Sequence, residues 1–215
     1  MIDKIKQYTD DIGDVYGSED LCIHLYSWVK MLKPRQIIEF GTGLGASTLW
    51  MNQAIKENGG GILHTIDDGS NFVEAAEIVG LSQRSYENYI VDLYNKFDIQ
   101  DGVTFYRCIV EDFYTEVGRH LEPESVDMIF SDYNHHPKTI EDMFNKYLPS
   151  LSRGSMVFID SAPSKRQSME MIEDICSYHG FNYYNIYENK DSPQASTCCI
   201  PVSYTHLRAH ETSTY

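Results

Sequence analysis

The sequence predicts an α/β fold in which a doubly wound, mostly parallel sheet of seven strands is covered by helices. Three observations support this prediction. Short apolar runs alternate with longer amphipathic stretches, which is typical of sheets built from strand–helix–strand units. The chain has 215 residues, a length that suits one domain. Apolar side chains make up 42% of it, which is enough to fill a core between a sheet and its helices.

The first strand and its flanking helices can be placed from periodicity. Residues 19–32 carry apolar groups at helical spacing and end at a lysine–proline pair. Residues 36–40 are then typical of a buried strand. A glycine-rich turn follows, and residues 47–56 resume the helical spacing before a run of three glycines, which favours a helix end.

The rest of the chain repeats this pattern. Further strands are expected at residues 62–66, 103–108, 126–130, 156–159, 181–187 and 195–200, and helices at 72–98 (interrupted at Gly80), 113–120, 138–151 and 165–179. Helical crossovers of this kind are right-handed and produce parallel strands. We therefore predict one domain over residues 1–201, with a helical region at its N-terminal end.

The segment 202–215 does not continue the pattern. Its sequence, VSYTHLRAHETSTY, offers no apolar face and resembles adaptor-derived read-through at the ends of some assembled environmental sequences. We leave it out of the predicted fold and expect it to be non-native or disordered. The alternative is a native tail that closes over a pocket.

Charge and composition exclude several classes of partner. The chain carries 17 basic and 32 acidic residues, a net charge of −15, which repels nucleic acid and anionic lipid. Neither a signal peptide nor an apolar run of the roughly 20 residues needed to span a bilayer is present. The five cysteines show no C-x-x-C spacing and suit reduced thiols. We expect a soluble, cytoplasmic protein without nucleic-acid or membrane partners.

The turn after the first strand is the strongest functional signal. Residues 39–47 read EFGTGLGAS, and alternate glycines let a backbone turn sharply and approach a ligand closely. Gly41, Gly43 and Ala46 also satisfy the dinucleotide fingerprint. A nicotinamide-dependent oxidoreductase and a tight turn without any ligand are therefore alternatives at this point.

Two acidic residues favour a different ligand. Glu39 ends the buried strand, where an unpartnered charge is costly; the amino group of a methionine moiety would be a natural partner, whereas a pyrophosphate would be repelled. Asp67 ends the next strand, where a carboxylate can accept both hydroxyls of a ribose. The alternative for the run Asp67-Asp68-Gly69-Ser70 is a helix N-cap, which we prefer for Asp68 only.

These motifs resemble a known family. EFGTGLGAS is similar to the first motif of the class I S-adenosylmethionine-dependent methyltransferases, and TIDD at residues 65–68 is similar to the second. The resemblance runs from about Gly13 to Ile200 and implies the Rossmann-like methyltransferase fold, with the last strand inserted antiparallel. It implies that the cofactor is S-adenosylmethionine, held by Glu39, Gly41, Thr42, Gly43, Gly45, Ser47, Asp67, Val110, Glu111 and Asp132. Of these, Asp67 would hold the ribose, and Val110 and Glu111 would contact the adenine.

The loops after the fourth and fifth strands are expected beside the cofactor, because ligands bind beyond the carboxyl ends of parallel strands. Residues 126–163 resemble the catechol-type, cation-dependent O-methyltransferases, in which an aspartate after strand four and an Asp-Asn pair after strand five hold a metal and a lysine serves as base. Asp132 and Asp160 match the aspartates. Ser161 replaces the asparagine, and His135 stands in the lysine's place.

Three interpretations of this cluster stay open. In the first interpretation, Asp132 and Asp160 bind Mg²⁺, and this ion would lower the pKa of an acceptor hydroxyl. Alternatively, His135 acts as a metal-free base. The third interpretation is that Asp132 caps the loop while His135 and His136 are ordinary exposed histidines. No spacing suits zinc.

The sequence thus predicts an S-adenosylmethionine-dependent methyltransferase that acts on a small molecule, with a hydroxyl as the expected acceptor. Catalysis would rest on alignment of acceptor and methyl carbon, with Asp132 and His135 as catalytic residues. An NAD(P)-dependent oxidoreductase and a non-catalytic S-adenosylmethionine-binding module are the alternatives. The composition is compatible with a homodimer.

Overall fold

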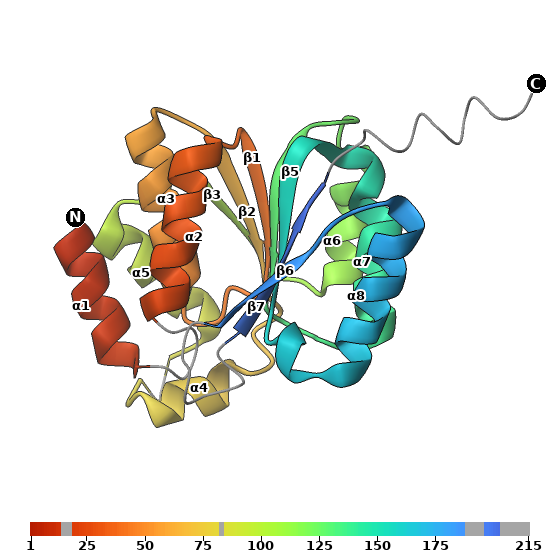
Figure 1. Ribbon diagram of the computed structural model, residues 1–215. Coiled ribbons are helices and arrows are strands. Elements are labelled where there is room, and N and C mark those ends of the chain that lie inside the picture. Colours follow the sequence, from red (N-terminus) through yellow and green to blue (C-terminus); the bar gives the residue numbers. More distant parts are fainter. Residues whose placement is uncertain (14–18, 82–83, 188–195, 203–215) are drawn as a thin grey trace, which may run out of the picture. The chain divides into compact units, whose positions relative to one another are not determined.

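The computed structural model describes residues 1–13, 19–81, 84–187 and 196–202 (Figure 1). The chain divides into two compact units, Met1–Phe113 and Tyr114–Tyr215. Each unit has its own strands, helices and buried apolar residues. The single domain over residues 1–201 stays a prediction.

The first unit is built on a parallel three-stranded sheet. Its strands are β1 (Gln36–Phe40), β2 (Ile62–Ile66) and β3 (Val103–Tyr106). Its helices are α1 (Ile2–Ile12), α2 (Glu19–Leu32), α3 (Ala46–Asn58), α4 (Phe72–Ile78) and α5 (Tyr86–Phe97), and α6 (Val110–Glu116) runs across the boundary of the units in the sequence. The strands pair in the order β3-β2-β1.

The second unit is built on a mixed sheet. Its strands are β4 (Val126–Ser131), β5 (Leu151–Asp160), β6 (Tyr184–Tyr187) and β7 (Ser196–Pro201), in the order β4-β5-β7-β6. Its helices are α7 (Pro137–Tyr147), α8 (Arg166–His179) and the short 3-10 turns η2 (Gly118–His120), η3 (Leu148–Ser150) and η4 (Ala162–Ser164). β4 and β5 are parallel, whereas β7 is antiparallel to both β5 and β6. The last strand is therefore inserted as predicted.

Helix ends agree with the predicted stop signals in most places. Gly59 after α3 and Gly180 after α8 adopt the left-handed conformation that closes a helix. One start differs from the prediction: the helix expected from residue 113 begins at Val110. Glu111 and Asp112 fall in its first turn, where carboxylates interact favourably with the helix dipole.

The connection into β5 also differs from the prediction. The helix expected over residues 138–151 ends at Tyr147, because Pro149 has no amide hydrogen to continue the helical ladder. β5 then begins at Leu151. The strand predicted at residues 156–159 is only its second part.

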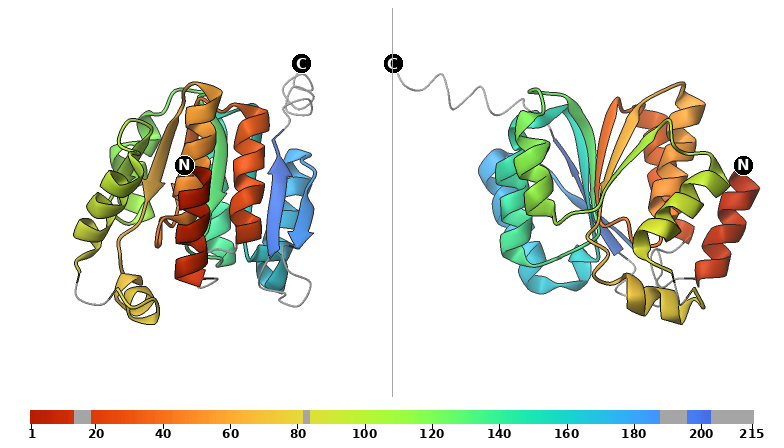
Figure 2. Two further views of the ribbon diagram at one scale, coloured as in Figure 1. Left: turned by 90° about the vertical axis from the view of Figure 1, so that its left-hand side faces the viewer. Right: turned by 180° about the vertical axis from the view of Figure 1, so that it is seen from behind.

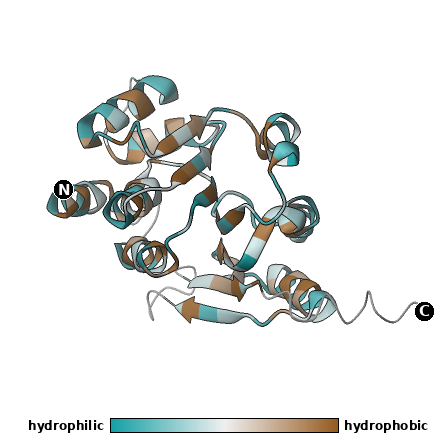
Figure 3. Ribbon diagram, turned by 90° about the horizontal axis from the view of Figure 1, so that it is seen from above, coloured by the Kyte–Doolittle hydropathy of each residue, from teal (hydrophilic) through white to brown (hydrophobic). Residues whose placement is uncertain are grey.

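The core of the first unit includes the apolar residues of β1. In β1, Ile37, Ile38 and Phe40 have no exposed surface, which is typical of a parallel strand covered on both faces. The further views in Figure 2 show helices beside the strands of each unit. In Figure 3 the strands carry many hydrophobic residues, and the outer helices alternate between hydrophobic and hydrophilic residues.

The end of the described chain extends slightly beyond the predicted domain. Val202 is fully buried and exchanges backbone hydrogen bonds with Gly154 and Ser155. Residues 203–215, the rest of the predicted tail, lie outside the described residues. The five cysteines are free thiols. In the described part of the chain, no helix has the length and apolar character needed to cross a bilayer.

Candidate functional site

The glycine loop joins β1 to α3 in the first unit. Gly41, Gly43 and Gly45 have φ angles of 96°, 52° and 82°, a region that residues with a side chain rarely adopt. Gly45 precedes the first residue of α3. A Cβ atom on Gly45 would lie 2.5 Å from Cδ2 of Leu93 in α5. The tight turn therefore needs glycine both for its backbone angles and for its contact with α5.

Glu39 lies under this loop and has no exposed surface. Its carboxylate accepts hydrogen bonds from Ser47 Oγ at 2.5 Å and from Thr48 Oγ1 at 2.6 Å, both at the start of α3. Burial raises the pKa of the Glu39 carboxyl to about 7, although these hydroxyls oppose the shift. No ion pair to Glu39 is found within the described ranges. The predicted residues Glu39 and Ser47 are thus in direct contact, and the structure adds Thr48.

Asp67 follows β2, and its carboxylate is hydrogen-bonded to the glycine loop. Its Oδ2 accepts a hydrogen bond from the Gly43 amide at 2.8 Å, and its Oδ1 accepts one from the Gly69 amide at 2.7 Å. Burial raises the pKa of the Asp67 carboxyl. Each carboxylate oxygen can accept two hydrogen bonds, so capacity remains for hydroxyl donors. Asp68 instead accepts the Ser70 amide at 2.7 Å. The helix N-cap predicted for Asp68 is wrong, because α4 begins at Phe72 and its N-cap residue is Asn71.

The remaining loop contacts come from threonine and tyrosine. Thr42 Oγ1 lies 2.6 Å from Oγ1 of Thr65 in β2. The carbonyl oxygens of Gly43 and Leu44 accept hydrogen bonds from tyrosine hydroxyls of α1 and α5. The prediction did not include these tyrosines, because no local pattern connects residues so far apart in the sequence.

The predicted adenine residues start α6. Val110 is half-buried and Glu111 is exposed, both in the first turn of that helix. Phe113, three residues after Val110, packs against Tyr106 of β3 and His64 of β2, with ring centroids 4.9 Å and 6.3 Å apart. These contacts hold the start of α6 against β2 and β3.

The acidic pair of the second unit consists of Asp132, after β4, and Asp160, at the end of β5. The two carboxyl groups share a hydrogen bond. Ser161 Oγ donates to Asp160 Oδ2 at 2.8 Å, and Thr197 Oγ1 donates to Asp160 Oδ1 at 3.2 Å. Burial raises the pKa of Asp160. Because two carboxylates in contact do not readily both ionise, the pair favours either one shared proton or a bound cation.

The donor set around this pair suits only some metals. Within the described ranges, no group of three or more His, Cys, Asp or Glu side chains could hold a metal ion, so a structural zinc site does not fit. Mg²⁺ is commonly bound by one or two carboxylates together with water and substrate oxygens. Asp132 and Asp160 fit that arrangement.

The two histidines after β4 differ in their surroundings. Burial lowers the pKa of His135 to about 4, with a smaller effect from the charge of Lys165, and its Nδ1 is buried without a hydrogen-bond partner. His136 is exposed, and its Nδ1 accepts the Lys138 amide at the start of α7. His135 is therefore neutral at physiological pH, whereas His136 caps a helix.

A family model described as a methyltransferase domain matches residues 38–162, more than half of the chain. The chain belongs to this methyltransferase family. The match confirms the class I S-adenosylmethionine-dependent family predicted from residues 39–47 and 65–68, and it sets aside the oxidoreductase alternative.

Solved structures show the same fold. The O-methyltransferase TomG from Streptomyces achromogenes, in complex with SAM, has a TM-score of 0.68 at 19% identity and covers 88% of this chain and 82% of its own. An O-methyltransferase from Bacillus cereus, in complex with SAH, has a TM-score of 0.67 at 14% identity, with coverages of 94% and 90%. A methyltransferase from Geobacter sulfurreducens has a TM-score of 0.63 at 14% identity, and the match covers 95% of this chain and 89% of that one. These similarities confirm the Rossmann-like methyltransferase fold. A search of curated proteins gave no match.

The raised pKa of Glu39 makes the stability of the methyltransferase depend on pH. The pKa rises from 4.5 to about 7 on folding, so the folded state holds a proton that the unfolded state has lost between these values. The stabilisation is complete below pH 4.5 and is lost as the pH rises through about 7. Relative to Glu39→Gln, the wild-type protein should lose roughly 3 kcal/mol between pH 4 and pH 9.

Urea denaturation of both proteins across this pH range measures the difference. A difference in unfolding free energy that stays constant with pH would mean that the pKa of Glu39 does not change on folding.

Proposed function

We propose that this methyltransferase transfers the methyl group of S-adenosylmethionine to a hydroxyl of a small-molecule acceptor. The observation that carries the proposal is the fully buried Glu39 carboxylate at the end of β1, directly beneath a loop of three glycines with positive φ. Two of the structurally similar O-methyltransferases were solved in complex with SAM or SAH.

Glu39 acts on the methionine end through Ser47. Because Glu39 has no exposed surface, a ligand ammonium group meets the half-buried Ser47 first. The Ser47 hydroxyl gives its hydrogen to Glu39, so its oxygen is left with lone pairs that accept from a donor. An ammonium group fits this arrangement, whereas a phosphate group does not. Gly41, Thr42, Gly43 and Gly45 line the same turn.

Asp67 is proposed to hold the ribose, and Val110 and Glu111 the adenine. The Asp67 oxygens accept hydrogen bonds from backbone amides of the loop, and a carboxylate can accept ribose hydroxyls beside them. Asp67 would therefore both hold the glycine loop in place and bind the ribose of the cofactor.

On the acceptor side, Asp132 and His135 are proposed to take the acceptor's proton. The neutral imidazole of His135 can accept a proton without first losing one, and with Nδ1 buried this would occur at Nε2. Asp132 and Asp160 are the residues that would hold Mg²⁺. Such an ion, when bound, would lower the pKa of the acceptor hydroxyl.

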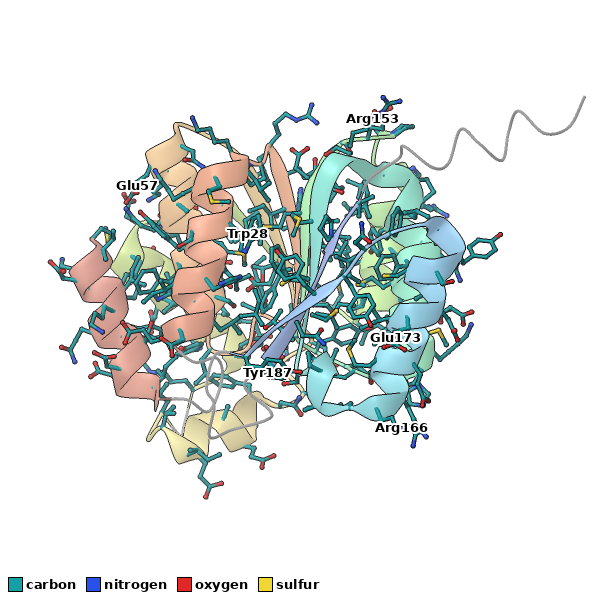
Figure 4. All side chains as sticks on the ribbon, viewed as in Figure 1. Trp28, Glu57, Arg153, Arg166, Glu173 and Tyr187 are labelled. Atoms are coloured by element: carbon teal, nitrogen blue, oxygen red, sulfur yellow. The ribbon has the colours of Figure 1, made fainter. Side chains whose placement is uncertain are left out.

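The homodimer and the cytoplasmic location also stay proposals. Tyr184 and Tyr187 of the edge strand β6 are exposed, and Tyr187 lies at the end of that strand in Figure 4. Aromatic side chains at a sheet edge are suited to an interface between copies.

Calorimetric titration with S-adenosylhomocysteine tests the cofactor assignment. The wild-type protein should bind it, and Asp67→Ala should raise the Kd at least about thirtyfold, because acceptors for two hydroxyls are lost. Asp68→Ala is the matched control, since Asp68 is the neighbouring carboxylate and its hydrogen bonds go to Ser70. If the wild-type protein gives no heat, or if both variants behave alike, the assignment of Asp67 fails.

Mn²⁺ binding followed by electron paramagnetic resonance tests the metal proposal. Asp160→Asn should weaken binding at least about tenfold, because a charged ligand is lost, whereas Asp142→Asn on the exposed face of α7 should have no effect. If the wild-type protein binds no Mn²⁺, the metal proposal is contradicted, and His135 is left as the residue that takes the proton of the acceptor.

Methyl transfer from labelled S-adenosylmethionine to a panel of phenols separates an enzyme from a non-catalytic binding module.

A further inference from the structure

Three tyrosine hydroxyls hold the carbonyl side of the glycine loop. Tyr86 OH donates to the Gly43 carbonyl oxygen at 3.0 Å. Tyr8 OH and Tyr89 OH lie 2.5 Å and 2.8 Å from the Leu44 carbonyl oxygen and also contact each other, so one hydroxyl donates to the carbonyl and the other donates to its neighbouring hydroxyl. Tyr8 belongs to α1, whereas the other two belong to α5 (Figure 1). Two helices distant in sequence therefore meet at one peptide group.

The rings that carry these hydroxyls are fixed in position. Tyr8, Tyr86 and Tyr89 are 7%, 4% and 5% exposed. Phe72 of α4 packs on Tyr86 and Tyr89 with centroids 4.9 Å and 5.1 Å apart, and Phe97 lies 5.4 Å from Tyr8. Because buried aromatic rings cannot easily reorient, each hydroxyl is presented to the loop in one direction.

The loop needs these donors because water cannot replace them. Leu44 is 1% exposed, and a buried carbonyl without a partner is costly. Each tyrosine hydroxyl carries one hydrogen, so the contacting pair provides one donor to the Leu44 oxygen and keeps the other hydrogen between the two hydroxyls. Gly43 is held at both of its backbone groups, with its amide on Asp67 and its carbonyl on Tyr86.

We propose that Tyr8 and Tyr89 are positioning residues for the methyl donor, and that α1 is therefore part of the cofactor site. They hold the Leu44 peptide, and with it Gly43 and Gly45, in the conformation that receives the ligand. The inference rests on the proposed function of this loop. It adds that binding depends on a helix that contributes no ligand contact of its own.

Because Tyr8 and Tyr89 share one acceptor, the Leu44 carbonyl oxygen, the double variant should lose more affinity than the two single variants predict. In Tyr8→Phe or Tyr89→Phe, the Leu44 carbonyl keeps one donor. In the double variant it keeps neither, although the rings still fill their places. The loss of affinity in the double variant should therefore exceed the product of the two single losses.

Calorimetry with S-adenosylhomocysteine measures this effect. Each single variant should raise the Kd about threefold, and the double variant about thirtyfold or more. Tyr26→Phe is the matched control, because Tyr26 donates to Glu57 on the outer side of α3 (Figure 4) and should leave the Kd unchanged. Hydrogen exchange should accelerate at the amides of residues 43–46 in the double variant and stay slow in the core strand β1.

The outcomes are distinguishable. A wild-type protein that does not bind S-adenosylhomocysteine overturns the proposed function. Normal wild-type binding with an unchanged Kd in the double variant overturns only the positioning role. If the Kd rises only in proportion to a global loss of stability by urea denaturation, with exchange accelerated throughout the first unit, the tyrosines are packing residues and the proposal is wrong.

Discussion

The hydrogen bonds between the buried Glu39 carboxylate and the Ser47 and Thr48 hydroxyls are the interaction on which the site depends. They join the end of β1 to the start of α3 across the glycine loop. Burial alone would keep this carboxyl protonated, and the two donors oppose that effect. The two hydroxyls limit the rise of the pKa to about 7, so the carboxyl beneath the loop is partly ionised at neutral pH.

The loop is then fixed from its other sides by short contacts. Asp67 holds the Gly43 amide, and tyrosines of α1 and α5 hold the next carbonyl groups. Gly45 lies so close to Leu93 that a side chain there would collide. A loop held in this way is ready for its ligand before the ligand arrives, which reduces the ordering cost of binding.

The sequence predicted those parts of the site whose signal is local. Glycine spacing placed the turn, and the strand ends placed Glu39 and Asp67 in the first unit and, separately, Asp132 and Asp160 in the second. The paired carboxyls of the second unit agree with the expectation that loops after parallel strands meet. The side chains brought in from afar could not be predicted: Tyr8 and Tyr89 reach Leu44 from 36 and 45 residues away. The burial of His135 depends on packing that no spacing reveals.

A crystal structure of the protein with S-adenosylhomocysteine would locate the amino group and the ribose of the ligand. We expect the amino group within hydrogen-bond distance of Ser47 Oγ, with Glu39 behind it, and the ribose hydroxyls on Asp67. A ligand whose carboxylate or ribose occupies the position beside Ser47, or a Glu39 side chain rotated away from both hydroxyls, would contradict this expectation.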